Sequence, residues 1–98
     1  MKFVQAIEFT TTRIDEFNTK LDAWMSATDG RRIPHRASLR RDRDAENLYV
    51  LVVEFSSHEK GMENSSRPET GEFAAFLSDI SDDGLKFRNL DVLREEDL

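Results

Sequence analysis

One stretch of eight residues, 48–55, constrains the fold more than any other part of the chain. Its sequence, Leu-Tyr-Val-Leu-Val-Val-Glu-Phe, is apolar at almost every position and rich in β-branched and aromatic residues. A short apolar run without alternation is typical of a β-strand that is buried on both faces. We therefore expect a sheet with this strand near its centre and with cover for both sheet faces.

The other elements can be placed around this strand from their apolar periodicity and their turn residues. The pattern predicts, in chain order, a strand at 3–9, a helix capped by Thr12 and ending near 29–30, an edge strand after Pro34, the central strand, a short helical turn capped by Ser57, a helix at 68–81 and a strand at 85–93. Gly61 is expected to weaken the helical turn. This order predicts a single α+β domain, residues 1–98, with a ferredoxin-like β-α-β-β-α-β fold, an antiparallel four-stranded sheet and two helices on one face.

The second sheet face has no helix left to cover it. The central strand would place Leu and Val side chains there, and a contiguous apolar patch of that kind is unusual on a soluble monomer. Apolar burial contributes roughly 25 cal/mol per Å², so covering several hundred Å² is worth many kcal/mol before association costs. We expect a homodimer that packs sheet to sheet, which is the arrangement of a dimeric α/β barrel.

Composition excludes several classes of partner and site. The chain has a net charge of −6 and no cysteine, so nucleic acid and anionic membranes are poor partners, and disulfides and thiolate metal sites are impossible. The arginines between residues 31 and 43 are interleaved with Asp42 and Asp44 and have no aromatic neighbours for stacking on bases. Neither an apolar leader nor an apolar run of about 18 residues is present, so we expect a cytoplasmic protein.

Taken together, these segments resemble the dimeric α/β-barrel family, a ferredoxin-like group that includes the antibiotic biosynthesis monooxygenase-like domains. The resemblance is carried by strand 3–9, helix 14–24, strand 48–55 and the stretch 57–65 that leads into Pro68-Glu69-Thr70. It is similar in particular to a small uncharacterised subgroup that ends in a Phe-Arg-Asn-Leu-Asp-Val strand, here residues 87–92. The resemblance covers nearly the whole chain, but it concerns topology more than catalytic motifs.

Members of this family carry out cofactor-independent oxygenation of aromatics, haem degradation, quinol oxidation and lactone isomerisation, and some have no known activity. The haem-degrading branch uses an Asn, a Trp and a His, the latter two around the second helix. Residues 61–83 contain neither Trp nor His, and position 7 is Ile where an Asn is expected nearby. The resemblance therefore implies no haem, and we expect no cofactor.

Two aromatic residues are candidates for the site. His58 follows the central strand, where it could act as a general base at the mouth of a cleft, or it could be an exposed residue at a helix start. Trp24 closes the apolar stripe of the first helix and is either core or the floor of an aromatic-ligand pocket. His35 has no neighbouring ligands at metal-binding spacing, so we interpret it as an interior or interface residue.

Five polar residues complete the candidate set. Gln5, Tyr49 and Asn89 interrupt apolar strands, and a small-molecule site combines apolar walls with a few such groups. The same residues could instead lie at a rim or across a dimer interface. Asn64 and Arg88 could orient a substrate oxygen or carboxylate; alternatively, Asn64 caps the break before Pro68, and Arg88 pairs with Glu8 or Glu54.

Two functional hypotheses follow. In the first, the protein binds a hydrophobic or aromatic small molecule between helices and sheet, and oxidises or isomerises it without a cofactor, with His58 as base and the polar groups as substrate contacts. In the second, it is a non-catalytic dimeric interaction or structural module, and the same residues serve packing. No residue motif in the sequence decides between them, so whether the protein is an enzyme is left open.

Overall fold

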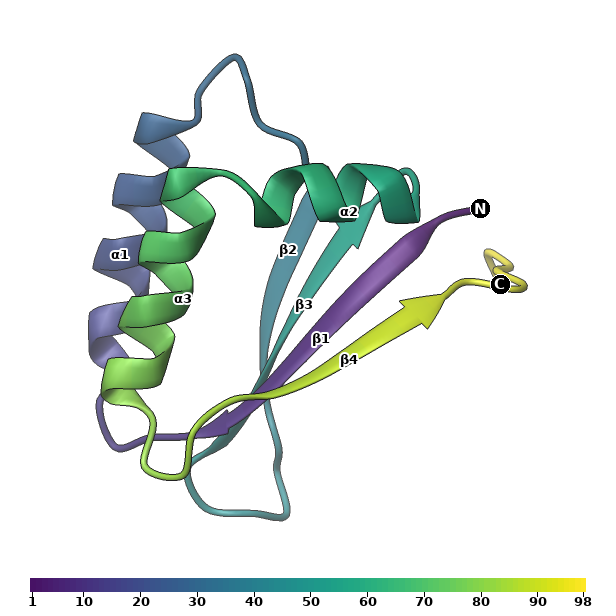
Figure 1. Ribbon diagram of the computed structural model, residues 1–98. Coiled ribbons are helices and arrows are strands. Elements are labelled where there is room, and N and C mark those ends of the chain that lie inside the picture. The colour runs from purple at the N-terminus through teal and green to yellow at the C-terminus, as the bar shows by residue number, and fades with distance from the viewer.

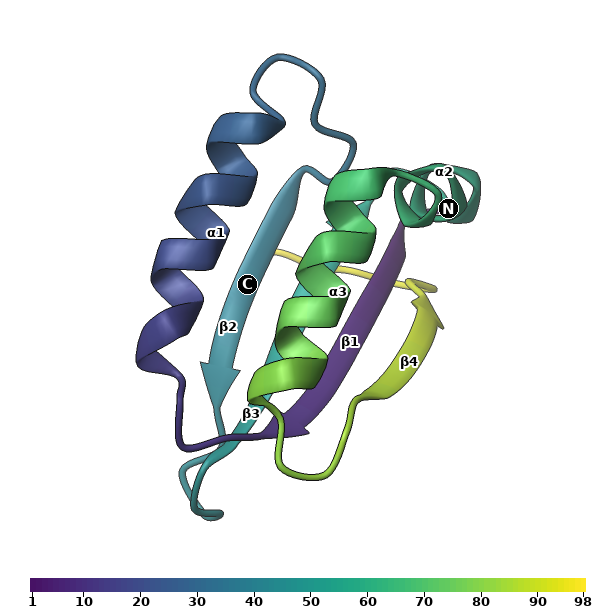
Figure 2. The ribbon, with the colours of Figure 1, turned by 60° about the vertical axis from the view of Figure 1, so that its left-hand side comes forward.

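The computed structural model describes all residues, 1–98. Its elements are β1 (Phe3–Thr10), α1 (Asp15–Ala27), β2 (Arg36–Arg41), β3 (Leu48–Phe55), α2 (His58–Ser65), α3 (Pro68–Ile80) and β4 (Lys86–Asp91). The four strands form one antiparallel sheet in the order β2-β3-β1-β4. Helices α1 and α3 lie side by side over one face of the sheet, and no element covers the other face (Figures 1 and 2). The predicted ferredoxin-like fold is confirmed, with the predicted helical turn extended into a helix, α2.

Strand register assigns each side chain to one of the two faces. Phe3, Gln5, Ile7 and Phe9 of β1 lie opposite Phe55, Val53, Leu51 and Tyr49 of β3. Because side chains alternate along a strand, these residues share the helix-covered face. Val50 and Val52 point to the open face, where they are only half-buried. In the single chain the central strand is therefore buried on one face only. The expected cover of its other face by a second subunit stays a prediction.

The core fills one end of the space between the helices and the sheet. It is a cluster of six buried side chains from both layers, namely Ile7, Phe9, Phe17, Leu51, Leu77 and Ile80. Phe17 of α1 is 1% exposed, and its ring meets Phe73 of α3 edge to face with the centroids 5.6 Å apart. We call the part of this cluster formed by Phe9, Phe17 and Ile80 the closed end of the helix–sheet interface.

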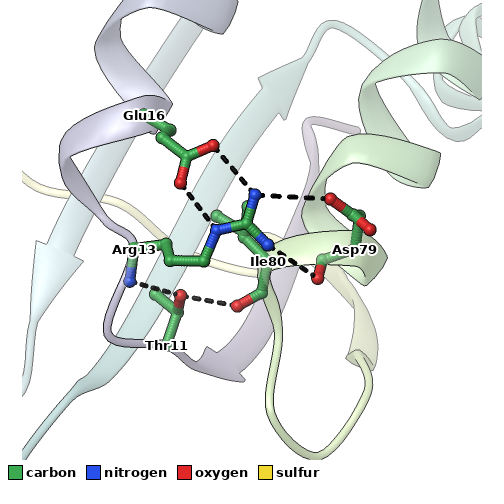
Figure 3. A network of polar contacts seen from close by, with 5 residues as sticks. All are labelled: Thr11, Arg13, Glu16, Asp79 and Ile80. Carbon is green, nitrogen blue, oxygen red and sulfur yellow. Dashed lines mark hydrogen bonds and ion pairs between the residues drawn. The ribbon is translucent and has the colours of Figure 1, made fainter.

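A polar network fastens the start of α1 to the end of α3 beside the closed end (Figure 3). Thr11 Oγ1 donates to the Ile80 carbonyl at 2.6 Å and accepts from the Arg13 backbone N–H at 2.9 Å. The Arg13 guanidinium binds both carboxylate oxygens of Glu16 and also reaches Asp79, which raises the pKa of Arg13 and lowers that of Glu16. The predicted Thr12 cap is wrong: Ile14 occupies the N-cap position without a side-chain bond, because Thr11 holds the turn that leads into the helix.

Helix α2 lies across the end of the sheet where β1 begins and β3 ends (Figure 1). Ser57 caps it as predicted, accepting from the Lys60 backbone N–H at 3.2 Å. Gly61 does more than weaken this helix, because a Cβ atom there would lie 2.7 Å and 2.8 Å from two ring atoms of Phe3. The glycine therefore allows α2 to approach β1 closely.

The remaining differences from the sequence-based expectations lie at the sheet edges. His35 lies just before the outer strand β2 and is exposed in the single chain rather than interior, and its alternative place at an interface stays a prediction. β4 is shorter than the predicted strand at both ends, and all six of its residues are exposed. The C-terminal residues 94–98 are exposed, although Glu95 reaches Lys2 at 2.8 Å, which lowers the pKa of Glu95. No helix is long and apolar enough to span a membrane.

Candidate small-molecule site

The other end of the helix–sheet interface is hollow. A cavity of about 260 Å³, partly open to solvent, lies there and is lined by 17 residues, 11 of them hydrophobic. All four strands and all three helices contribute to the lining, which consists of Gln5, Ile7, Leu21, Trp24, Pro34, Ala37, Leu51, Val53, Phe55, Asn64, Ser65, Thr70, Gly71, Phe73, Ala74, Leu77 and Phe87. We call this region the open end.

Small side chains leave this end unfilled. Ala37 of β2 and Gly71 and Ala74 of α3 border the cavity, whereas Phe9, Phe17 and Ile80 fill the closed end. Gln5 stands between Phe3 and Ile7 on the same face of β1. A well-packed interior contains few voids larger than a water molecule, so a cavity of this size is a distinct feature of the fold.

Aromatic rings form one wall of the cavity. Trp24 of α1 and Phe73 of α3 meet edge to face, with their centroids 6.4 Å apart. The Arg32 guanidinium lies 5.5 Å from the Trp24 ring centre, outside the lining, and donates to the Met25 carbonyl at 2.8 Å. This contact holds Trp24 at the end of α1, where its ring can meet a planar ligand.

The polar groups of the lining are all uncharged. Gln5 Nε2 donates to Asn89 Oδ1 at 3.2 Å, and Ser65 Oγ donates to the Gly61 carbonyl at 3.0 Å. The half-buried side-chain amide of Asn64 makes no hydrogen bond. The Asn64 amide and the Thr70 hydroxyl, which makes no hydrogen bond either, are therefore the uncommitted polar groups of the cavity. No group of three His, Asp or Glu side chains lies close enough together to hold a metal ion.

The connection between α1 and β2 borders the cavity through buried Pro34. It is tied to the start of α3 by an ion pair between Arg31 and Glu69 and by a hydrogen bond from the Arg67 guanidinium to the Arg31 carbonyl. The hydrogen bond from Arg31 lowers the pKa of the Glu69 carboxyl, and hydrogen bonding to the backbone of Glu69 itself adds to the effect. Polar contacts thus add to the packing of Pro34 in holding this border of the cavity.

The structure brings three of the seven predicted site residues together. Gln5, Trp24 and Asn64 line the cavity. Asn89 reaches it only through its bond to Gln5, since its own side chain lies exposed on β4. These three residues belong to one strand and two helices, and the sheet register and helix packing place them around one space.

The other three predicted residues lie elsewhere. Tyr49 stacks on Phe9 at the closed end, with centroids 6.0 Å apart. Arg88 is opposite Ala6 in the register and points to the open sheet face, where it pairs with neither Glu8 nor Glu54. His58 is exposed and packs edge to face on Phe3 at 5.1 Å, outside the cavity lining. A catalytic role for His58 stays a prediction, and it has no contact with this space.

Several lining residues were not singled out from the sequence. Phe73 and Leu77 belonged to the apolar stripe of the second long helix and could not be told from core residues. Nothing in the sequence near Ser65 or Thr70 indicates a binding site. Gly71 is different, because a glycine four residues into a predicted helix lowers helix propensity without forming a turn.

Comparison with known proteins supports the fold. No protein-family model and no curated protein sequence matches the chain. Among solved structures, Rv0793 from Mycobacterium tuberculosis is 16% identical, with a TM-score of 0.76 over 99% of this chain and 100% of that one. A variant of SnoaB, a cofactor-independent oxygenase from Streptomyces nogalater, is 18% identical, with a TM-score of 0.77 over 96% and 95%. The chain shares the fold of these proteins.

A third match extends the same likeness. An antibiotic biosynthesis monooxygenase is 12% identical, with a TM-score of 0.71 over 96% of this chain and 100% of that one. Matches at such identities establish the architecture, whereas activity depends on the residues of the site. The site of this chain must therefore be interpreted from its own lining.

Proposed function

We propose that this protein binds a neutral, hydrophobic or aromatic small molecule in the cavity at the open end. The observation that carries the proposal is the lining itself: an aromatic wall, no charged side chain, and one amide, that of Asn64, without a partner. An anionic or cationic ligand would lose its hydration there without gaining an opposite charge. A ligand with a carbonyl or hydroxyl group on an apolar frame matches both kinds of surface.

Size and polarity favour the same class of ligand. The volume of about 260 Å³ lies just below the range of roughly 300–1,000 Å³ found for small-molecule sites. Such sites have apolar walls with a few placed polar groups, here the amides of Gln5 and Asn64 and the hydroxyls of Ser65 and Thr70. A compact fused-ring compound with one or two oxygen substituents is therefore the expected ligand.

The reaction we propose is oxidation of such a compound by dioxygen without a cofactor. The likeness to SnoaB, a cofactor-independent oxygenase, supports this choice of reaction. In the simplest balanced form, a ring CH₂ group becomes C=O, one atom of dioxygen enters the product and the other leaves as water. The CH₂ group would lose its proton to solvent water, which reaches the partly open cavity, and amide N–H groups of Asn64 and Gln5 would stabilise the enolate oxygen that forms.

Binding is tested first, with a matched pair of asparagine variants. Asn64→Ala removes the unpartnered amide of the cavity, whereas Asn18→Ala removes an exposed amide on α1. We expect the wild type and Asn18→Ala to bind the neutral fluorophore N-phenyl-1-naphthylamine and oxygenated analogues of it. Asn64→Ala should weaken the oxygenated analogues by about fivefold to tenfold, since one hydrogen bond is lost, and leave the parent fluorophore unaffected. Equal affinities of both variants for every analogue would refute the role of Asn64.

The reaction is tested with anthrone, a neutral three-ring compound that has the required CH₂ group beside a carbonyl. The protein should accelerate its conversion to anthraquinone, with uptake of one dioxygen per product, in the presence of a metal chelator and without added cofactor. Binding without turnover would leave the cavity as a carrier site. An unchanged rate in Asn64→Ala would exclude this amide from the chemistry.

We further propose that the active form is a homodimer formed through the open sheet face. The centre of this face is apolar, with Val4, Ala6, Val50 and Val52 on adjacent strands. Ion pairs flank it on both sides, Arg36 with Glu54 and Lys86 with Glu8, each at 3.7 Å. An apolar centre within a polar rim is the usual anatomy of a protein–protein interface, and a two-fold axis would bring the face against itself.

The dimer is tested by mass. The wild type should show twice 11.4 kDa in native mass spectrometry. Val52→Glu would bury two carboxylates against each other and should give monomer, whereas Thr19→Glu on the exposed side of α1 should not. A wild type that dimerises but binds no aromatic probe would favour the non-catalytic dimeric module instead.

A further inference from the structure

We propose that Gly71 determines the size of ligand that the cavity accepts, by leaving an opening between α3 and β4. The inference rests on the proposed small-molecule function and concerns the same cavity. No other feature of the structure explains why position 71 is a glycine. Gly71 lies inside α3 and lines the cavity.

Neither packing nor backbone geometry requires a glycine at this position. A Cβ atom on Gly71 would meet nothing within 4 Å, and its φ angle is not in the left-handed region. Gly61 is the opposite case, since its Cβ would collide with the Phe3 ring. Alanine favours a helix interior more than glycine does. Glycine at position 71 therefore lowers the stability of the helix. The one visible consequence of its missing side chain is open space at the cavity border.

The position of Gly71 on α3 locates this opening. Phe73 points toward α1, where its ring meets Phe17 and Trp24. At 3.6 residues per turn, Gly71 and Ala74 lie on the other flank of the helix. On that side the sheet continues to β4, over which no long helix lies (Figure 2). The flank of α3 that faces the uncovered strand thus presents Gly71 and Ala74 to the cavity.

Phe87 marks the opposite side of the opening. It lies opposite Ile7 in the strand register, so its side chain is on the helix-covered face, yet it is 48% exposed. The ring lines the cavity from β4, while Gly71 and Ala74 line it from α3. A flat ligand can pass between an aromatic ring and a helix surface that bears only a glycine and an alanine at this point. A bulky side chain at position 71 would narrow this passage.

The test compares Gly71→Leu with Ala75→Leu, which adds a similar bulk to the same helix at an exposed position outside the lining. The probes are 1-naphthol, with two fused rings, and N-phenyl-1-naphthylamine, with a third ring. Relative to wild type, Gly71→Leu should weaken the larger probe by about tenfold or more and the smaller one by less than about threefold. Ala75→Leu should change neither, and Gly71→Ala should fall between wild type and Gly71→Leu.

Thermal unfolding is measured for all variants, so that loss of fold is not mistaken for loss of access. Because leucine and alanine both favour a helix more than glycine, the melting temperatures of the Gly71 variants should equal or exceed that of wild type. Equal affinities for the larger probe in Gly71→Leu and Ala75→Leu would overturn the proposal, as would an equal loss for both probes. A wild type that binds neither probe would overturn the proposed function, and this inference with it.

Discussion

The closed and open ends of the helix–sheet interface are built from the same two layers of backbone but are filled differently. At the closed end, Phe9, Phe17 and Ile80 are each no more than 2% exposed. At the open end, Gln5, Gly71 and Ala74 leave a cavity between the same strands and helices. The comparison teaches that close packing and empty space are separated along one interface. One end is packed to hold the layers together, so the other can remain hollow.

The largest expected difference between the two ends is in the cost of removing a side chain from α1. Phe17→Ala should lower the free energy of unfolding by about 3–5 kcal/mol, because it opens a void in a close-packed cluster. Leu21→Ala, one turn further along and already bordering the cavity, should cost only about 1–2 kcal/mol, since it enlarges existing space. Urea denaturation measures both. Equal costs would mean that the open end is packed as tightly as the closed end.

The two helical glycines should respond to the same substitution with opposite signs. Gly61→Ala forces a Cβ against the buried Phe3 ring and should destabilise the protein by about 1–3 kcal/mol. Gly71→Ala meets open space and should stabilise it by about 0.5–1 kcal/mol through helix propensity. Thermal melting of the two single variants gives the comparison directly. Destabilisation by Gly71→Ala would indicate that position 71 is packed.

A smaller effect on stability is expected at the ion pair between Arg31 and Glu69, which holds the border of the open end. Arg31 lowers the pKa of the Glu69 carboxyl, so the ionised form favours folding. This stabilisation is present above the ordinary carboxyl pKa and is lost as pH falls through the lowered value. Glu69→Gln should therefore melt below wild type at about pH 7, and the gap should close toward about pH 3. Glu72→Gln, an exposed carboxylate on α3 without an ion pair, should show no such gap at either pH.

The smallest expected effect concerns His58. No titratable side chain lines the cavity, so affinity for N-phenyl-1-naphthylamine should stay constant between about pH 5 and 8, the range in which an ordinary histidine titrates. His58→Gln should bind as wild type does, and any pH profile of turnover should be the same in both. If the acid limb of the rate profile disappeared in His58→Gln, the histidine would regain the role of general base that its sequence position suggests.

The sequence was most informative where local periodicity matches tertiary burial. The apolar run 48–55, the glutamine interrupting strand β1 and the proline at the start of α3 each have the predicted place. It was least informative about partners distant in the chain. Tyr49 and Gln5 both break an apolar pattern on the helix-covered face, yet one packs against Phe9 and the other borders a cavity. Nothing within either strand distinguishes the two.

The sequence by itself determined the order of elements, the ferredoxin-like architecture and the face to which each strand residue points. These properties follow from short-range periodicity and from the need to bury apolar surface. Only the tertiary structure decided where the space between the layers is filled and where it is left open. That outcome depends on the combined volumes of side chains from seven elements that meet at one place, and no single segment encodes such a sum.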